Sequence, residues 1–379
     1  MSIKHAFVSA ADQSGDTSVV SKNEWNALHV TNGPDDYPAS PSAFDDEFDT
    51  LSGWTTLGTL DTLNVTDFPG HLHMTRRGAV SSVEANGVYK AAPTPPFVIT
   101  TKVSDYLMYQ NHHWFGIMLT DSTPTRLFIA GMIFSTNPFY TWGRWSSRTA
   151  RDGNAESFGH WNSDQYYRLV VVNKTCVFVA ISKDGQVWHP VYPGVSPGLT
   201  PANIGLAIVQ WNTGINNMEA TFDWLRVETP GTPLIPVMTS ATAPSGTASQ
   251  KTYYNNTNWQ AWAAMGGNGS GTGWLSATGD MPTWIKYQFG STTTATKYSL
   301  TPWWTDTYPG RTPKTWKLQG SNDDAAWTDL DSQTNWVPTL ATLPVFTIAS
   351  PDSYLYYRLY ITANNGDSYT GLGSFMLYT

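Results

Sequence analysis

The chain is built from short apolar runs that have the length of β-strands, and turn-forming residues separate these runs. "HWFGIML", "RLFIAGMIF" and "IGLAIVQW" are continuous apolar runs, which are typical of buried strands. "WIKYQF" alternates instead, placing Ile285, Tyr287 and Phe289 on one face of a strand. "YLYYRLYI" alternates in the same way. No long amphipathic helix can be read along the chain. The pattern therefore predicts an all-β protein.

The stretch "YYRLVVVNKTCVFVAISKDGQVWHPVY" shows how neighbouring runs connect. It contains two strand-like runs and the dipeptide Asp184-Gly185, which is a strong signal for a β-hairpin turn. At 379 residues the chain is too long for one ordinary core and suits two or three domains. Two β-sandwiches in tandem follow from these observations.

The charge of the chain excludes some partners. Charged residues make up 13% of the sequence, about half of the roughly 25% that is usual in soluble domains. The formal net charge is −8 and the isoelectric point is about 5.4. An acidic chain with few cations is not expected to bind nucleic acid or an anionic membrane through a basic face. No stretch approaches the length of a membrane span or of a secretory apolar region, so we expect no membrane insertion.

Turn-rich stretches divide the chain into three segments. The stretch "VTNGPDDYPASPS" has turn formers and no apolar periodicity, and it predicts an arm over residues 1–42. A second break is "TPGTPLIP", whose three prolines and one glycine cannot continue a sheet. We therefore expect one sandwich over residues 43–230 and another over residues 231–379.

Three stretches of the last segment carry a family resemblance: "WLSATGDMPTWIKYQFG", "RTPKTWKLQGSNDDAAWTDLD" and "YYRLYITANNGDSYTGLGSFMLY". In order and spacing this segment resembles the discoidin, or coagulation-factor type C, domain of the galactose-binding-like superfamily. The resemblance implies a jelly-roll sandwich that binds glycans, or sometimes lipid head groups or proteins, through loops at one end.

Many discoidin-like domains hold a structural calcium ion with an Asp in an early loop and a Glu near the C-terminus. This sequence has Gly267 and Asn268 in the corresponding loop, and Ser374 near the end. A hard cation needs several oxygen ligands, normally including carboxylates. The substitutions therefore predict that no tight calcium site is present, although backbone carbonyls could still supply a weak one, and we expect no cofactor.

The middle segment opens with "DDEFDTLSGWTTLG" and closes with "ATFDWLRVE". With its central hairpins it resembles the concanavalin-like, or laminin-G-like, jelly roll. Some relatives of that fold are glycanases that carry a Glu-x-Asp-x-x-Glu run on one strand, and this sequence has no such run.

The first segment, "KHAFVSAADQSGDTSVVSKNEWNALHV", resembles an N-terminal stretch of bacteriophage tail and tail-fibre proteins. In such proteins this end commonly anchors the chain to the particle. The resemblance implies a virion protein whose residues 1–42 bind other virion proteins. Tail appendages are often homo-trimers, but no coiled-coil heptads are present here to indicate one.

Catalysis has little support in the sequence. Glycosidases need two carboxylates that face each other across a cleft. Asp45, Asp46, Glu47 and Asp49 stand near an expected strand start, where an acidic turn is the ordinary explanation. Asp152, Glu156 and Asp164 lie in an expected loop. Zinc needs three or four converging ligands, and the histidine pairs of this chain have no evident further ligands. We therefore expect no catalytic residues and no metal site.

Two aromatic clusters are candidates for carbohydrate binding. In "FYTWGRWSSR", Trp142 and Trp145 stand three residues apart around Gly143, so a bend could expose one indole. The competing and favoured interpretation is core packing, since large aromatic side chains are mostly buried.

The second candidate is the loop "PWWTDTYPGR". The adjacent residues Trp303 and Trp304 would point to opposite faces of a strand, so one core cannot easily hold both. An exposed indole could stack on a sugar ring, with Asp306, Tyr308 and Arg311 as polar partners. The alternative is that Trp303 is a core residue and Arg311 belongs to a structural "R-x-P-K-x-W" motif; the sequence favours neither.

Taken together, the sequence predicts a non-enzymatic phage virion protein of the tail, fibre or baseplate. We expect it to be assembled in the host cytoplasm and to bind host-surface carbohydrate for adsorption. One alternative is a structural or capsid-decoration protein whose sandwiches bind other virion proteins. A polysaccharide depolymerase and a secreted bacterial adhesion module are further alternatives.

Overall fold

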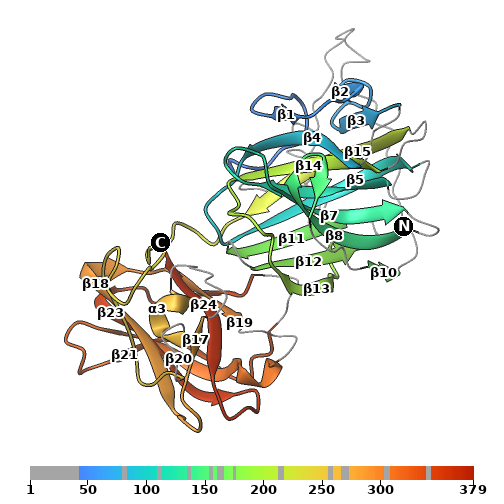
Figure 1. Cartoon of the computed structure of the whole chain (residues 1–379). Coiled ribbons are helices and arrows are strands. Elements are labelled where there is room, and N and C mark those ends of the chain that lie inside the picture. The colour runs from blue at the N-terminus through green and yellow to red at the C-terminus, as the bar shows by residue number, and fades with distance from the viewer. Residues whose placement is uncertain are drawn as a thin grey trace.

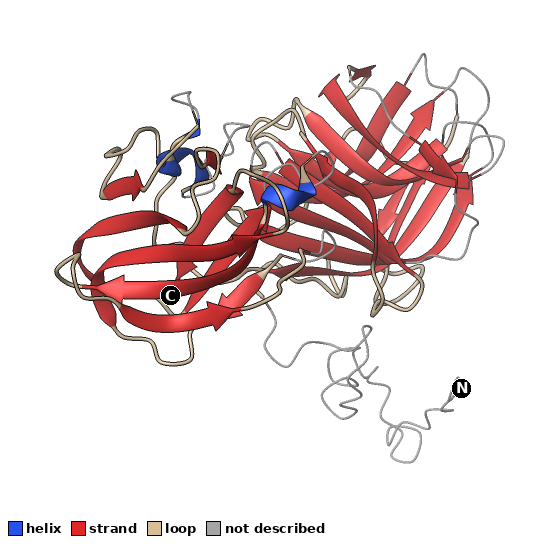
Figure 2. Ribbon diagram, turned by 90° about the horizontal axis from the view of Figure 1, so that it is seen from below, coloured by secondary structure: helices blue, strands red, loops and turns tan. Residues whose placement is uncertain are grey.

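The computed structural model confirms the all-β prediction, with two β-sandwiches that follow each other along the chain (Figures 1 and 2). It describes residues 42–379 except 79–82, 109–112, 135–137, 153–156, 160–165, 174–175, 212–216, 255–258, 266–272, 303–307 and 339–342. The predicted arm therefore lies outside the described residues apart from Ser42.

The first sandwich is formed by two antiparallel sheets. One contains, in order, β1 (Thr55–Leu57), β4 (Val83–Ala91), β14 (Asn203–Trp211), β6 (His113–Thr120), β7 (Leu127–Phe134), β8 (Pro138–Ser147) and β10 (Ser157–Gly159), with β9 (Ala150–Arg151) paired to β8. The other contains β13 (His189–Val195), β12 (Cys176–Ser182), β11 (Tyr166–Asn173), β5 (Phe97–Met108), β15 (Met218–Glu228), β3 (Leu72–Arg76) and β2 (Thr62–Asn64).

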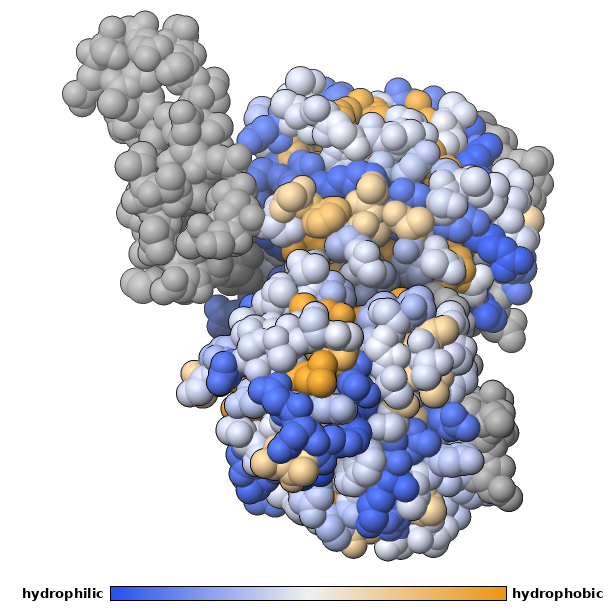
Figure 3. Space-filling view, turned by 90° about the vertical axis from the view of Figure 1, so that its left-hand side faces the viewer, coloured by the Kyte–Doolittle hydropathy of each residue, from blue (hydrophilic) through white to orange (hydrophobic). Residues whose placement is uncertain are grey.

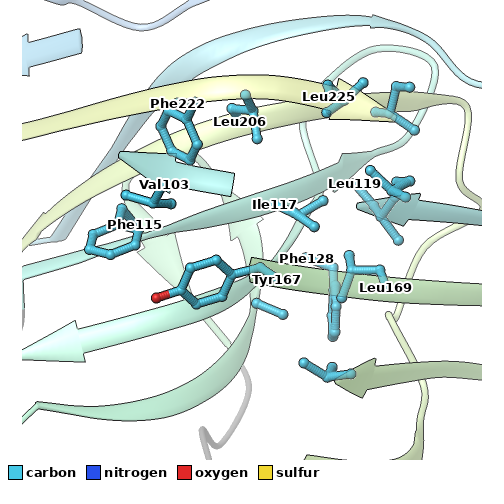
Figure 4. Packing of buried hydrophobic residues seen from close by; sticks show 14 of the residues in the cluster. Val103, Phe115, Ile117, Leu119, Phe128, Tyr167, Leu169, Leu206, Phe222 and Leu225 are labelled. Atoms are coloured by element: carbon cyan, nitrogen blue, oxygen red, sulfur yellow. The ribbon is translucent and has the colours of Figure 1, made fainter. Parts of the chain in front are cut away.

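The core of the first sandwich lies between these sheets. Figure 4 shows side chains of β6 and β7, among them Phe115, Ile117 and Phe128, facing Tyr167 of β11 and Phe222 of β15. Alternate residues of each strand contribute to this layer, as the two-residue repeat of a strand requires. Burial of such apolar surface is the main force that holds the sheets together.

The eight-stranded sheet is apolar on its other face as well. A second buried cluster on that face includes Trp114 and Met118 of β6, Ile129 of β7, Trp145 of β8 and Val209 of β14. Strand β6 is therefore buried along its whole length. This explains why "HWFGIML" is continuously apolar, because a strand covered on both faces has no polar side.

The second sandwich is smaller. Its five-stranded sheet contains β16 (Thr247–Gln250), β18 (Thr283–Thr294), β23 (Ser353–Asn364), β20 (Pro313–Ser321) and β21 (Thr328–Gln333). Its four-stranded sheet contains β17 (Trp274–Leu275), β24 (Gly371–Tyr378), β19 (Lys297–Pro302) and β22 (Val345–Thr347). A short helix, α3 (Ala261–Ala264), and a 3-10 turn, η2 (Pro309–Arg311), lie in the connections.

The segment between the sandwiches is anchored to the second one. The Leu234 amide donates a hydrogen bond to the Leu377 carbonyl over 2.8 Å, and Ile235 and Met238 are buried in the second core.

The two sandwiches also contact each other. Leu343 of the second packs against a buried cluster on the outer face of the seven-stranded sheet, which consists of Val98, Val170, Val172 and Phe178. Figure 3 shows one face of the molecule, on which apolar residues gather in small patches among polar ones.

The expected hairpin at Asp184-Gly185 is wider than a two-residue turn. Strand β12 ends at Ser182 and β13 begins at His189. Within the connection the Asp184 carboxylate accepts hydrogen bonds from the amides of Gln186 and Val187, over 2.9 and 2.8 Å. Gly185 has a φ of +69°, a left-handed conformation that glycine adopts without steric cost. The two strands pair as predicted, but side-chain hydrogen bonds organise the longer loop.

Candidate functional site

Three connections meet at one end of the second sandwich. They are the segment before α3, the connection that contains η2, and the turn between β23 and β24. The Asp367 amide donates a hydrogen bond to the Gly310 carbonyl over 3.3 Å, and the Asn365 amide donates to the Thr312 carbonyl over 3.0 Å. The Asn364 side chain donates to the carbonyl of Tyr369 over 2.7 Å. The first two bonds fix the β23–β24 turn against η2 and the residue that follows it, and the third bond closes the turn itself.

Arg311 is the centre of this end. Its guanidinium carbon lies 3.8 Å from the centre of the Tyr308 ring and 5.1 Å from the centre of the Tyr369 ring. Its Nε donates a hydrogen bond to Asp367 Oδ2 over 3.3 Å. Two aromatic rings and one carboxylate thus hold the cation. Such a cation is attracted to the negative faces of aromatic rings, and its planar fork keeps a defined direction.

Further aromatic rings join this group through contacts with Tyr369. Tyr254 is 43% exposed and Tyr308 is 41% exposed. The Tyr254 ring meets Tyr369 edge to face at 5.5 Å and meets Trp259 edge to face at 6.5 Å. Large aromatic side chains are usually mostly buried, so two exposed rings in the group that holds one charged pair are informative. We define Tyr254, Trp259, Tyr308, Arg311, Asp367 and Tyr369 as the loop site.

The loop site contains part of the set predicted from the sequence. Tyr308 and Arg311 lie together as expected. The other three predicted residues of this loop, Trp303, Trp304 and Asp306, lie outside the described residues.

Four members of the loop site escaped the sequence analysis: Tyr254, Trp259, Asp367 and Tyr369. A signal was present, because "TYYNNTNW" and "NNGDSY" place aromatic residues in polar, turn-forming stretches. Nothing in the sequence, however, indicated that those stretches meet at Arg311.

The cluster around Gly143 is not a ligand surface. Trp142 is 8% exposed and stacks on Phe128 with ring centres 5.9 Å apart. Trp145 is 1% exposed and lies against Trp114. Both faces of the sheet are covered by apolar residues here, so neither indole has a free face for a sugar ring. The structure corrects the assignment of these two residues to carbohydrate binding and places them in apolar clusters.

The acidic residues near the start of the first sandwich have structural contacts. Asp45 accepts a hydrogen bond from the Val227 amide over 2.6 Å. Asp46 accepts from the Trp54 indole over 2.7 Å and from Lys90 over 3.1 Å. Glu47 forms an ion pair with Arg226. These carboxylates join the entering chain to β15 and β4.

The described part of the chain holds neither a cluster of metal ligands nor a long apolar helix. Within it, no group of three or more His, Cys, Asp or Glu side chains is arranged to hold a metal ion. Among the loop carboxylates considered for catalysis, Glu156 and Asp164 lie outside the described residues. No helix in the described ranges is both long enough and apolar enough to cross a bilayer.

No protein-family model matches the chain, and no curated protein matches it. Among solved structures, the chain is similar to a mutant of chitosan-binding module 1 from a chitosanase/glucanase of Paenibacillus sp. IK-5. That alignment has 23% identity and a TM-score of 0.30, and covers 37% of this chain and 98% of the module.

Two further solved structures show similarity of the same order. The family 32 carbohydrate-binding module of Clostridium perfringens NanJ, in complex with galactose, has 16% identity and a TM-score of 0.30 over 35% of this chain and 93% of that one. A mutant of the GH43 protein BlXynB from Bacillus licheniformis has 18% identity and a TM-score of 0.38 over 50% of this chain and 40% of that one.

Proposed function

We propose that this chain binds carbohydrate through the loop site and acts as a non-enzymatic phage adsorption protein. The observation that carries the proposal is the position of Arg311, whose guanidinium lies over the ring of Tyr308, near the ring of Tyr369, and is bonded to Asp367. Exposed aromatic faces stack on the C–H face of a pyranose. The guanidinium and the carboxylate offer donors and acceptors to its hydroxyl groups. A few fixed polar groups among aromatic ones are typical of small-ligand sites.

The role in a virion rests on the resemblance of residues 1–42 to the attachment stretch of phage tail proteins. The arm would bind other virion proteins, while the second sandwich would face the host surface. A single shallow sugar site is weak, but many copies on one particle bind by avidity. The same proposal includes assembly in the host cytoplasm and location in the tail, fibre or baseplate. It also includes oligomerisation, with a trimer as one candidate state.

Binding is tested by substituting Tyr254→Ala and Arg311→Gln in the full chain and measuring binding to a glycan array and to host cells. Loss of an aromatic stacking face is expected to weaken binding by about tenfold or more, because burying such a face contributes on the order of 1.5–3 kcal/mol. The matched control is Phe68→Ala, which removes an exposed ring from the first sandwich. Variants that fold and bind every glycan like the unmodified chain would exclude the loop site.

The attachment role is tested separately by removing residues 1–42. The truncated chain should fold and bind sugar, yet be absent from particles. Normal incorporation of the truncated chain would contradict the role of the arm. Separation of heads from tails distinguishes adsorption from capsid decoration, and release of reducing sugar from host polysaccharide would indicate a depolymerase.

A further inference from the structure

The outer face of the five-stranded sheet carries a second group of aromatic and cationic side chains. Strands β18 and β23 pair in register so that three pairs of residues lie side by side: Trp284 with Tyr360, Lys286 with Arg358, and Gln288 with Tyr356. The intervening residues, such as Ile285 and Leu359, are buried in the core. By the alternation of a strand, the three pairs lie on the opposite face, where none is fully buried. We name the group of Trp284, Lys286, Trp327, Tyr356, Arg358 and Tyr360 the sheet platform.

A chain of contacts fixes Arg358 in the middle of the platform. Its Nε donates a hydrogen bond to Gln319 Oε1 over 2.7 Å, and Gln319 Nε2 donates to Asp329 Oδ1 over 2.6 Å. Lys317 donates to the other oxygen of Asp329 over 2.6 Å. The bonds from Lys317 and Gln319 lower the pKa of the Asp329 carboxyl, so this anchor stays ionised at neutral pH.

Aromatic rings support the same guanidinium. Its carbon lies 3.9 Å from the centre of the Trp327 ring and 5.1 Å from that of Tyr360. Only Nε of Arg358 has a hydrogen-bond partner among the described residues. The two terminal amino groups, the pair that binds a carboxylate in two parallel bonds, are therefore held in place and available to a ligand.

The charge around Arg358 favours an anion. Lys286 lies over Trp284 at 5.1 Å and over Tyr356 at 5.5 Å, and its ammonium pairs with Asp324 over 2.5 Å. Three cations, Lys286, Lys317 and Arg358, lie here beside the two carboxylates Asp324 and Asp329. Both lysines are paired with carboxylates, whereas Arg358 forms no ion pair within 4.0 Å among the described residues, so its charge is the one that a ligand anion can pair with.

We propose that the sheet platform binds an extended anionic polysaccharide whose sugar rings carry carboxylates, that is, a uronic-acid polymer. A carboxylate pairs with the open fork of Arg358, and neighbouring pyranose rings lie on Tyr360 and Trp284 on one side and on Tyr356 on the other. Tyr356 and Tyr360 each stand two residues from Arg358, about 7 Å along the strand. The platform lies on the open face of a sheet, which suits an extended polysaccharide. The loop site suits a single sugar or the end of a polysaccharide.

The test measures, by calorimetry on the full chain, the binding of hexamers of galacturonate, mannuronate and glucuronate, each beside its fully methyl-esterified form. The unmodified chain should bind at least one acid hexamer and bind its neutral ester much more weakly. Arg358→Gln should lower that affinity by about tenfold or more, since a charge-assisted bidentate pair is lost. Arg358→Lys keeps the cation without the planar fork, so this variant should bind the acid hexamer several-fold more weakly than the unmodified chain. It provides the test if Arg358→Gln fails to fold.

Two control variants locate the binding on the platform. Arg126→Gln removes one exposed cation from the first sandwich and should leave hexamer binding unchanged. Tyr308→Ala alters the loop site, and it should leave the difference in affinity between the acid hexamer and its ester in place. The proposal is overturned if none of the acid hexamers binds, if acid and ester bind equally, or if folded Arg358 variants bind like the unmodified chain. Loss of hexamer binding in Tyr308→Ala alone would assign the polymer to the loop site and leave the proposed function standing.

Discussion

The rings of Trp114 and Trp145 lie with their centres 4.9 Å apart and their planes tilted by 50°. They come from β6 and β8, which flank β7 in the eight-stranded sheet. Gly143 lies beneath both rings, where a Cβ atom would stand 2.7 Å from Trp114 and 3.1 Å from Trp145. The absence of a side chain at Gly143 therefore allows the two indoles to cover the outer face of the sheet.

Replacing Trp145 by Ala should destabilise the first sandwich without affecting sugar binding. Removing a fully buried indole leaves a cavity, and such changes cost roughly 3–5 kcal/mol. Chemical denaturation gives the loss of stability, and the glycan array gives the binding. A folded Trp145→Ala variant that keeps its stability but loses binding would show that this residue contacts the ligand.

Gly116→Ala should be strongly destabilising. A Cβ atom at this position would lie 2.1 Å from the backbone oxygen of Ala130 on the neighbouring strand, and a paired strand cannot easily move away. Overpacking of this kind costs about 1–3 kcal/mol. Gly290→Ala is the matched control, because nothing lies within 4 Å of the Cβ it would add. Equal melting temperatures of the two variants would contradict the tight pairing of β6 with β7.

His113 should make the protein less stable in acid. The side chain is fully buried, and burial lowers its pKa from 6.5 to about 4. Above pH 6.5 the ring is neutral in both the folded and the unfolded chain, so protonation of His113 does not reduce the free energy of unfolding there. As the pH falls toward 4 the unfolded chain binds the proton first, and stability decreases by up to roughly 3 kcal/mol.

The measurement is the free energy of unfolding between pH 7 and pH 4 for the unmodified chain and for His113→Leu. Because other groups titrate in this window, the difference between the two curves is the informative quantity. The substituted chain should lose less stability on acidification. Parallel curves would show that His113 is solvated or charged in the folded state.

Calcium should not stabilise the chain. By its resemblance to discoidin-like domains the sequence has Ser374 where a carboxylate is usual, and Ser374 is buried on β24. Gly267 and Asn268 lie outside the described residues. A cation that binds only the folded state at 100 times its Kd would add about 2.7 kcal/mol. Melting curves in excess chelator and in millimolar calcium should therefore coincide. A rise in melting temperature with calcium would reveal a site built from other oxygens.

The sequence determined the class of fold and which residues of a strand share a face. The alternation in "WIKYQF" separated Ile285 and Tyr287, which are buried, from Lys286, which lies on the outer face. A strand has a repeat of two residues, so this separation is local and can be read directly from the chain.

Only the tertiary structure decided what each face meets. Alternation distinguishes the two faces of β8 but does not say that a second apolar layer covers the outer one, and this layer buries Trp145. In the same way, Arg311 and Tyr308 are close in sequence, whereas Asp367 and Tyr369 reach them only because the β23–β24 turn is bonded to η2. Local patterns depend on backbone geometry, while the loop site depends on contacts between segments more than fifty residues apart, which no local pattern encodes.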